Sequence, residues 1–160
     1  MMRIARINYP DLLYVADNMR DMDKNEIFAT RWDENPESLV DSIMKYGDFG
    51  WVVGSEDGIP IAAFGAIPIW PGSWQVWMFA TDRWNEVSTQ VTKFIKRVMI
   101  PAIVDAGWNR AECKSIEDHP TAHRWLEMLG ATHEHTLACF GKDGQAFRLY
   151  SWTKDTFKPN

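Results

Sequence analysis

Two periodic patterns of hydrophobic residues follow one another along this chain, one with the period of a strand and one with that of a helix. Residues 74–81 are rich in aromatic side chains and follow the turn signal Pro71-Gly72-Ser73, a pattern that is typical of a buried strand. After a polar loop over residues 82–86, apolar positions recur every three or four residues and predict a long helix over residues 87–106. These positions are Val87, Val91, Phe94, Ile95, Val98, Ala102 and Ile103. Pro101 predicts a kink near residues 97–101 because it removes a backbone hydrogen bond.

Shorter elements are predicted on both sides of this unit. Strand-like runs cover residues 3–8, 51–55, 59–69, 110–114, 132–140 and 145–153. Asp57-Gly58 supplies the positive φ of a tight hairpin, and the glycines of residues 141–144 indicate a second hairpin. Helical patterns begin at Pro10 and cover residues 36–46 and 120–129. Residues 20–32 are charged and poorly periodic, with a helical turn at most around Ile27 and Phe28.

This order of elements predicts an α/β (α+β) fold in a single domain. Strand-helix-strand units need crossovers while hairpins pair antiparallel, so we expect a mixed, mostly antiparallel sheet of six or seven strands with helices on both faces. A chain of 160 residues with 46% hydrophobic content can bury one full core. We expect the domain to cover residues 1–153 and a tail to cover residues 154–160.

Composition narrows the functional classes. With 17 basic and 22 acidic residues the net charge is −5, which argues against nucleic acid and anionic membranes as partners. Cys113 and Cys139 are far apart and lack a paired-ligand motif, so a soluble protein of a reducing, cytoplasmic interior is expected. His119 and His123 are four apart, but no third ligand is suitably spaced, so packing or surface roles are favoured and no metal site is predicted.

Residues 119–131, His-Pro-Thr-Ala-His-Arg-Trp-Leu-Glu-Met-Leu-Gly-Ala, resemble a late segment of the GCN5-related N-acetyltransferase (GNAT) superfamily. Ala122, Glu127, Leu129 and Gly130 match the family's Asn-x-x-Ala-x-x-Leu-Tyr-Glu-Lys-Leu-Gly-Phe pattern, in which a short helix ends at a glycine. The order of elements along the whole chain is similar to that of the same family. The resemblance implies a GNAT-like domain that transfers an acetyl group from acetyl-CoA to a primary amine.

The resemblance also implies where acetyl-CoA would bind. Phe79, Ala80 and Thr81 would lie against its pantetheine arm, with a backbone N–H polarising the thioester carbonyl. The family's pyrophosphate loop corresponds to residues 83–88, where Arg83, Asn85 and Ser88 would hold the phosphates. Glu86 departs from the family pattern because it replaces a glycine and adds negative charge next to Asp82.

Two further expectations concern the chemistry. The tyrosine that often protonates the departing thiolate in this family falls on Leu126, which donates no proton. For the base that accepts the amine proton, the nearest candidates are Glu117, Asp118 and His119, followed by Glu112. Trp84 lies in the polar loop with nothing local to bury it, so it is expected to cover the ligand cleft or contact another chain.

A second resemblance is to the small internal virion proteins of short-tailed bacteriophages. It rests on the GNAT-like element order, the degenerate loop at Glu86, Leu126 in place of tyrosine, and nine tryptophans in a small chain. This resemblance implies the alternative of a non-catalytic GNAT-fold protein inside a virion, with other virion proteins as partners. Binding of acetyl-CoA separates the two classes.

Overall fold

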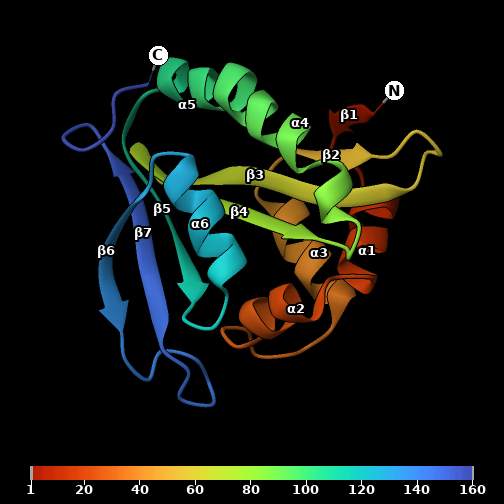
Figure 1. The fold of residues 1–160 in the computed structure, drawn as a ribbon, viewed down its shortest axis with the longest axis horizontal. Helices are drawn as coiled ribbons and strands as arrows, with labels where there is room; N and C mark the ends of the chain where they lie inside the picture. Colours follow the sequence, from red (N-terminus) through yellow and green to blue (C-terminus); the bar gives the residue numbers. More distant parts are fainter. Residues whose placement is uncertain (1, 160) are drawn as a thin grey trace.

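A mixed sheet of seven strands forms the centre of the described chain (Figure 1). In the computed structural model, which describes residues 2–159, its strand order is β1-β2-β3-β4-β5-β7-β6. The strands are β1 (Arg3–Arg6), β2 (Gly50–Gly54), β3 (Pro60–Trp70), β4 (Gly72–Ala80), β5 (Trp108–Ile116), β6 (Thr132–Leu137) and β7 (Phe147–Thr153). The β4–β5 pair is parallel and the other five neighbouring pairs are antiparallel. The predicted mixed, mostly antiparallel sheet is confirmed.

Helices cover both faces of the sheet, as expected. The helices α1 (Tyr9–Asp17), α2 (Asp21–Phe28) and α3 (Pro36–Lys45) lie on one side, and α4 (Ser88–Phe94), α5 (Ile100–Ala106) and α6 (Pro120–Met128) lie on the other (Figure 1). Alternate strand residues separate the two cores. Val52 packs in the cluster formed by α1 and α3, whereas its neighbours Trp51 and Val53 pack in the cluster that includes the long α4–α5 unit.

The predicted kink in the long helix takes the form of a widened turn. Between α4 and α5, residues Ile95–Met99 form a π-helical segment, η2, in which the N–H of Ile100 donates to the carbonyl of Ile95. This segment directly precedes Pro101, which lacks an N–H and crowds the preceding turn. Val98, expected on the inner face, is 43% exposed, and Met99 is buried in its place. The widened turn shifts the helical phase, which a regular periodicity does not anticipate.

Two elements are longer than the sequence pattern indicated. Helix α2 extends over eight residues where only a single helical turn was expected. The buried residues of this helix are Asp23 and Phe28, of which one is charged. A helix that buries so few apolar side chains gives a weak apolar pattern in the sequence. Strand β5 extends over nine residues, beyond the predicted 110–114, because it pairs with β7 from Arg110 to Ile116.

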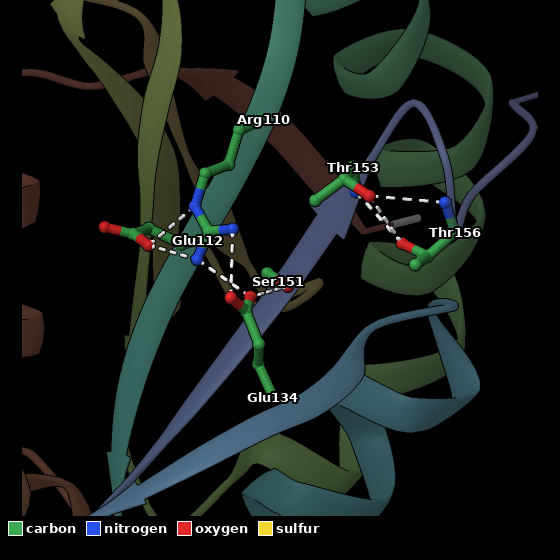
Figure 2. A network of polar contacts seen from close by, with 6 residues as sticks. All are labelled: Arg110, Glu112, Glu134, Ser151, Thr153 and Thr156. Atoms are coloured by element: carbon green, nitrogen blue, oxygen red, sulfur yellow. Dashed lines mark hydrogen bonds and ion pairs between the residues drawn. The ribbon is translucent and has the colours of Figure 1, made fainter.

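A charged network joins the strands β5, β7 and β6 (Figure 2). Arg110 on β5 donates to Glu112 at 2.7 and 2.9 Å and to Glu134 on β6 at 2.8 and 3.3 Å. Ser151 on β7 donates to Glu134 at 2.5 Å. The register of β6 shifts between His133 and His135, and this bulge brings Glu134 to the same side as Arg110. The network therefore ties the three-strand half of the sheet together.

Near its C-terminal end the chain packs back onto the start of β5. Within the predicted tail, Phe157 packs edge-on against Trp108 with ring centroids 6.3 Å apart. Met1 and Asn160, the outer limits of the predicted domain and tail, lie outside the described residues. Among the residues that are described, none of the helices has the length and apolar character needed to cross a membrane.

Gly65 is required where β2 and β3 approach closely. A Cβ at this position would lie 2.5 Å from the carbonyl oxygen of Phe49 and 2.8 Å from the Cα of Gly50. Both contacts are with backbone atoms, so a side chain cannot be accommodated by a rotamer change. We predict that Gly65→Ala lowers the free energy of unfolding by about 2–4 kcal/mol, measured by urea denaturation.

The control for this prediction is Gly58→Ala. A Cβ on Gly58 would meet nothing within 4 Å, and the only cost is its φ of +82°. A loss of about 1 kcal/mol is expected for this control. Equal losses for the two variants would contradict the assignment of backbone crowding to Gly65.

Candidate functional site

The parallel pairing of β4 and β5 ends halfway along the two strands. Their register includes Gly72 with Trp108 and ends at Gln75 with Glu112, after which the strands separate. A cavity of about 530 Å³ fills the separation. Its walls come from both faces of the sheet, with Val76–Phe79 on one strand and Cys113–Ser115 on the other. We call it the central cavity, and its size suits a small ligand.

Helix α2 lies at the open end of this separation and contacts β4 through Asp23. The Asp23 carboxylate accepts the backbone N–H of Ala80 at 2.8 Å, and Arg20 donates to the same carboxylate at 2.9 and 3.1 Å. The Nε2 of His119 lies 2.8 Å from it. Asp23 is 4% exposed, so these donors replace the water that a carboxylate needs. Asp23 thus provides a hydrogen-bond acceptor for the edge of β4 that has no partner strand beyond Gln75.

Glu26, one helical turn beyond Asp23, does the same for β5. Its Oε2 accepts the hydroxyl of Ser115 at 2.9 Å and the backbone N–H of Ile116 at 3.3 Å. Glu26 also lines the central cavity. Burial raises the pKa of Glu26 to about 7, against the smaller opposing effects of His119 and of the Ser115 hydrogen bond. A carboxylate with a pKa near 7 is suited to proton transfer.

The backbone of β4 offers a free edge at Met78. The N–H of Thr81 donates to Ile61 on the β3 side, while the N–H and carbonyl of Ala80 bond to Asp23 and Arg20. Along a strand, the backbone N–H and C=O groups of successive residues point to alternate edges. The backbone groups of Phe79 therefore point toward β3, and those of Met78 point toward the cavity. Of the predicted cofactor residues, Phe79 lines the cavity. The backbone N–H groups of Ala80 and Thr81 are already hydrogen-bonded within the protein.

The predicted phosphate loop is folded on itself. Arg83 donates to both oxygens of Glu86, at 2.7 and 2.8 Å, and approaches Asp57 at 3.4 Å. The pKa of the Glu86 carboxyl is lowered by Arg83. Asn85 is exposed, and Ser88 begins α4, whose first turn has no side-chain cap. The cavity walls include none of residues 81–88, so Arg83, Asn85 and Ser88 lie outside it.

Trp84 is a core residue, which corrects the expectation that it covers a cleft or contacts another chain. It is 5% exposed and packs edge-on against Trp125 of α6, with ring centroids 5.4 Å apart. The guanidinium of Arg20 lies 5.8 Å from the Trp84 ring centroid. Trp125 in turn donates to the Thr92 hydroxyl at 3.0 Å. These contacts join α6 to the long helix beside the loop that was expected to hold the phosphates.

Of the three predicted catalytic residues, only His119 borders the central cavity, and Glu117 and Asp118 line a surface depression apart from it. Glu117 is exposed and bonds to Arg148 at 2.9 Å through each oxygen, which lowers the pKa of Glu117. Asp118 is also exposed, in a separate surface depression. His119 borders the central cavity, but its Nδ1 accepts the N–H of Ala122 at 3.3 Å and its Nε2 bonds to Asp23. Both of its nitrogens are therefore engaged.

Other candidates are also occupied or hydrophobic. Glu112 is bound to Arg110 (Figure 2), and Leu126 lines the central cavity without a polar group. Within the described residues, no group of three or more His, Cys, Asp or Glu side chains could hold a metal ion. Sequence reasoning missed Glu26, although its three-residue spacing from Asp23 places both carboxylates on one face of a helix. That spacing was the available signal.

Solved acetyltransferases share this fold. Ard1 from Thermoplasma volcanium superimposes with a TM-score of 0.73 at 10% identity, covering 95% of this chain and 97% of that chain. A GNAT-family acetyltransferase from Bacillus anthracis gives 0.67 at 10% identity, covering 96% and 95%. A variant of the spermidine N-acetyltransferase SpeG from Vibrio cholerae gives 0.67 at 13% identity, covering 95% and 93%.

These likenesses establish the fold of GNAT acetyltransferases for the described chain. No protein-family model matches the sequence, and no curated protein sequence matches it either. The comparisons lend no support to the resemblance with virion proteins.

The raised pKa of Glu26 makes stability depend on pH. Because the folded protein holds this proton up to about pH 7 and the unfolded chain releases it near 4.5, Glu26 lowers the unfolding free energy as pH rises between these values. Glu26→Gln removes this effect. We predict that the stability of Glu26→Gln relative to wild type increases from pH 5 to pH 8, by on the order of 2 kcal/mol in urea denaturation.

Glu117→Gln is the matched control with the opposite sign. Since Arg148 lowers the pKa of Glu117, its contribution is present at neutral pH and is lost as pH falls. The relative stability of Glu117→Gln should therefore decrease, slightly, over the same rise in pH. Parallel pH profiles for the two variants would refute the assigned environment of Glu26.

Proposed function

We propose that the protein is an N-acyltransferase that moves an acetyl group from acetyl-CoA to an amine, with Glu26 as its base. The observation that carries this proposal is the central cavity, where a free backbone edge on β4 faces a carboxylate whose pKa is raised to about 7. The shared GNAT fold supports it, because two of the solved structures named above are acetyltransferases.

The residues around the cavity suit the acetylated arm of acetyl-CoA, which supplies an activated thioester. The N–H of Met78 faces the cavity and would donate to the carbonyl oxygen as it gains negative charge. Val76 and Phe79 would flank the arm on the same strand. An N–H fixed in a sheet needs no reorganisation during the reaction, which is why such a donor is effective. Met78 and Val76 thus take over the role that the resemblance assigned to Ala80 and Thr81.

Glu26 would prepare the amine. An alkylammonium must lose a proton before its nitrogen can attack the thioester carbonyl, and Glu26 as carboxylate accepts that proton. A new C–N bond forms, the C–S bond breaks, the thiolate leaves with the electron pair, and the second proton of the attacking nitrogen is released to solvent as the amide forms. Leu126 offers it no proton, but a thiol with a pKa near 8.5 leaves acceptably as the anion. We place Glu26 in this role rather than Glu117, Asp118 or His119, because the first two are exposed and the last has both nitrogens engaged.

The phosphate side of the site fits less well. Arg83 is neutralised by Glu86 and Asp57, and the Trp84–Trp125 contact fills the adjoining corner. These observations favour a second candidate, a non-catalytic protein with the GNAT fold, and the virion component named above would be of this kind. Weak binding of the pyrophosphate is the expectation common to both. The two candidates differ in whether acetyl-CoA binds at all.

Calorimetry with acetyl-CoA decides between the candidates. We predict a dissociation constant below about 1 mM, equivalent to roughly −4 kcal/mol, for the enzyme. Glu86→Gly removes a carboxylate, frees Arg83 and opens the backbone, so it should tighten binding several-fold to about tenfold. Glu86→Gln frees Arg83 without opening the backbone and should give part of this gain. Absence of binding by wild type and by Glu86→Gly would leave the non-catalytic alternative.

The role of Glu26 is tested by the pH profile of transfer. Wild-type kcat should rise with pH through about 7, as Glu26 becomes ionised. Glu26→Gln should lower kcat by about 10²–10⁴-fold and abolish this rise. The matched control is Glu37→Gln in the exposed first turn of α3, which should retain the wild-type profile. A wild-type profile in Glu26→Gln would remove Glu26 from the mechanism.

A further inference from the structure

On the α2–α3 side of the sheet, two cationic side chains line the central cavity. Arg31, just beyond α2, and Lys114, on β5, both line it. Within the part of the chain that the structure describes, neither forms an ion pair with a carboxylate. We call this part of the cavity the acceptor compartment. Arg31 and Lys114 thus place positive charge on this cavity although the protein has a net charge of −5.

Arg31 is held by neutral groups. Its NH2 group donates to the hydroxyls of Ser42 at 3.1 Å and Ser38 at 3.3 Å, while its Nε is buried without a hydrogen-bond partner. The carboxylate of Asp33 is joined to it through the hydroxyl of Ser38, which donates to Asp33 at 3.0 Å. A buried guanidinium N–H without an acceptor is costly, and an oxygen ligand would satisfy it.

Lys114 provides a second cation on the opposite wall. Its Nζ lies 5.9 Å from the ring centroid of Phe140, which also lines the cavity. The acidic side chains of the whole cavity wall are Asp23 and Glu26. Asp23 is fully used by Arg20, Ala80 and His119, which leaves Glu26 as the acid that faces the cavity. The acceptor compartment therefore carries more positive than negative charge.

We propose that the acceptor is a small amine that also carries a carboxylate, bound by Arg31 and Lys114 with its amino group toward Glu26. This inference rests on the proposed function and specifies its substrate class. A guanidinium fork binds a carboxylate with two charge-assisted hydrogen bonds, and Lys114 adds a point charge. A diamine or polyamine would bring a second cation against Arg31 and Lys114, which is repulsive.

The first experiment compares acceptors that differ only in the distal group. Acetyl transfer is measured with 4-aminobutyrate, butylamine and putrescine, and with the shorter series β-alanine, propylamine and 1,3-diaminopropane. In at least one series kcat/KM should be about tenfold or more higher for the carboxylate than for the neutral amine, and lowest for the diamine. A preference for the diamine or the neutral amine in both series would overturn the inference while leaving the transferase function intact.

The second experiment does not depend on turnover. Binding of 4-acetamidobutyrate, the acetylated carboxylate, is measured by calorimetry without acetyl-CoA, with N-butylacetamide as the uncharged reference. Arg31→Gln should weaken carboxylate binding about tenfold and leave N-butylacetamide unaffected, and Lys114→Gln should have a smaller effect in the same direction. Arg97→Gln is the matched control, because Arg97 is exposed on the long helix and outside the cavity.

Each outcome of this binding experiment bears on the proposal. Carboxylate binding that depends on Arg31 supports the acceptor compartment even if no acetyl transfer is detected. Equal affinity of wild type and Arg31→Gln, with both proteins folded by circular dichroism, refutes it. Should Arg31→Gln fail to fold, Lys114→Gln decides by the same comparison, because the Lys114 side chain contacts the ring of Phe140, which belongs to neither α2 nor α3.

Discussion

The structure depends on the early end of the β4–β5 ladder and on the two carboxylates that replace it. Once the strands separate beyond Gln75 and Glu112, each strand has backbone groups without a partner strand. Asp23 accepts the Ala80 N–H and Glu26 accepts the Ile116 N–H, so α2 satisfies part of both free edges at once. Without these acceptors the backbone N–H groups would need another partner, either the neighbouring strand or water. The cavity exists because a helix with acidic side chains holds its walls apart.

The same two carboxylates have different chemical roles because their surroundings differ. Asp23 has a guanidinium, a backbone N–H and an imidazole around it, which compensate its charge in a buried position. Glu26 has a hydroxyl and a single N–H, and burial raises its pKa to about 7. Two acids one helical turn apart thus differ in how their charge is compensated, because their neighbours differ.

Local patterns predicted the fold well. The Asp57-Gly58 turn, the helical repeat after residue 87 and the glycine stop at Gly130 each depend on neighbouring residues, and the structure places elements accordingly. The site was harder to predict because its contacts are distant in sequence. Asp23 and Ala80 are 57 residues apart, and Glu26 and Ile116 are 90 apart. Trp84 was misplaced for the same reason, since its burial depends on Trp125 of another helix.

The widened turn in the long helix has a geometric consequence for the wall it forms. In a regular α-helix each step of four residues rotates by about 40° around the axis, so residues 91 and 103 would face directions about 120° apart. Val91, Ile95, Met99 and Ile103 are nevertheless all buried against the sheet. The π segment, with more residues in its turn, cancels much of that drift and aligns the four in one straight stripe. Deleting a single residue between Ile95 and Met99 would remove the wide turn and leave Met99 and Ile103 seven and eleven residues after Val91, a spacing that keeps the four side chains on one face of a regular helix.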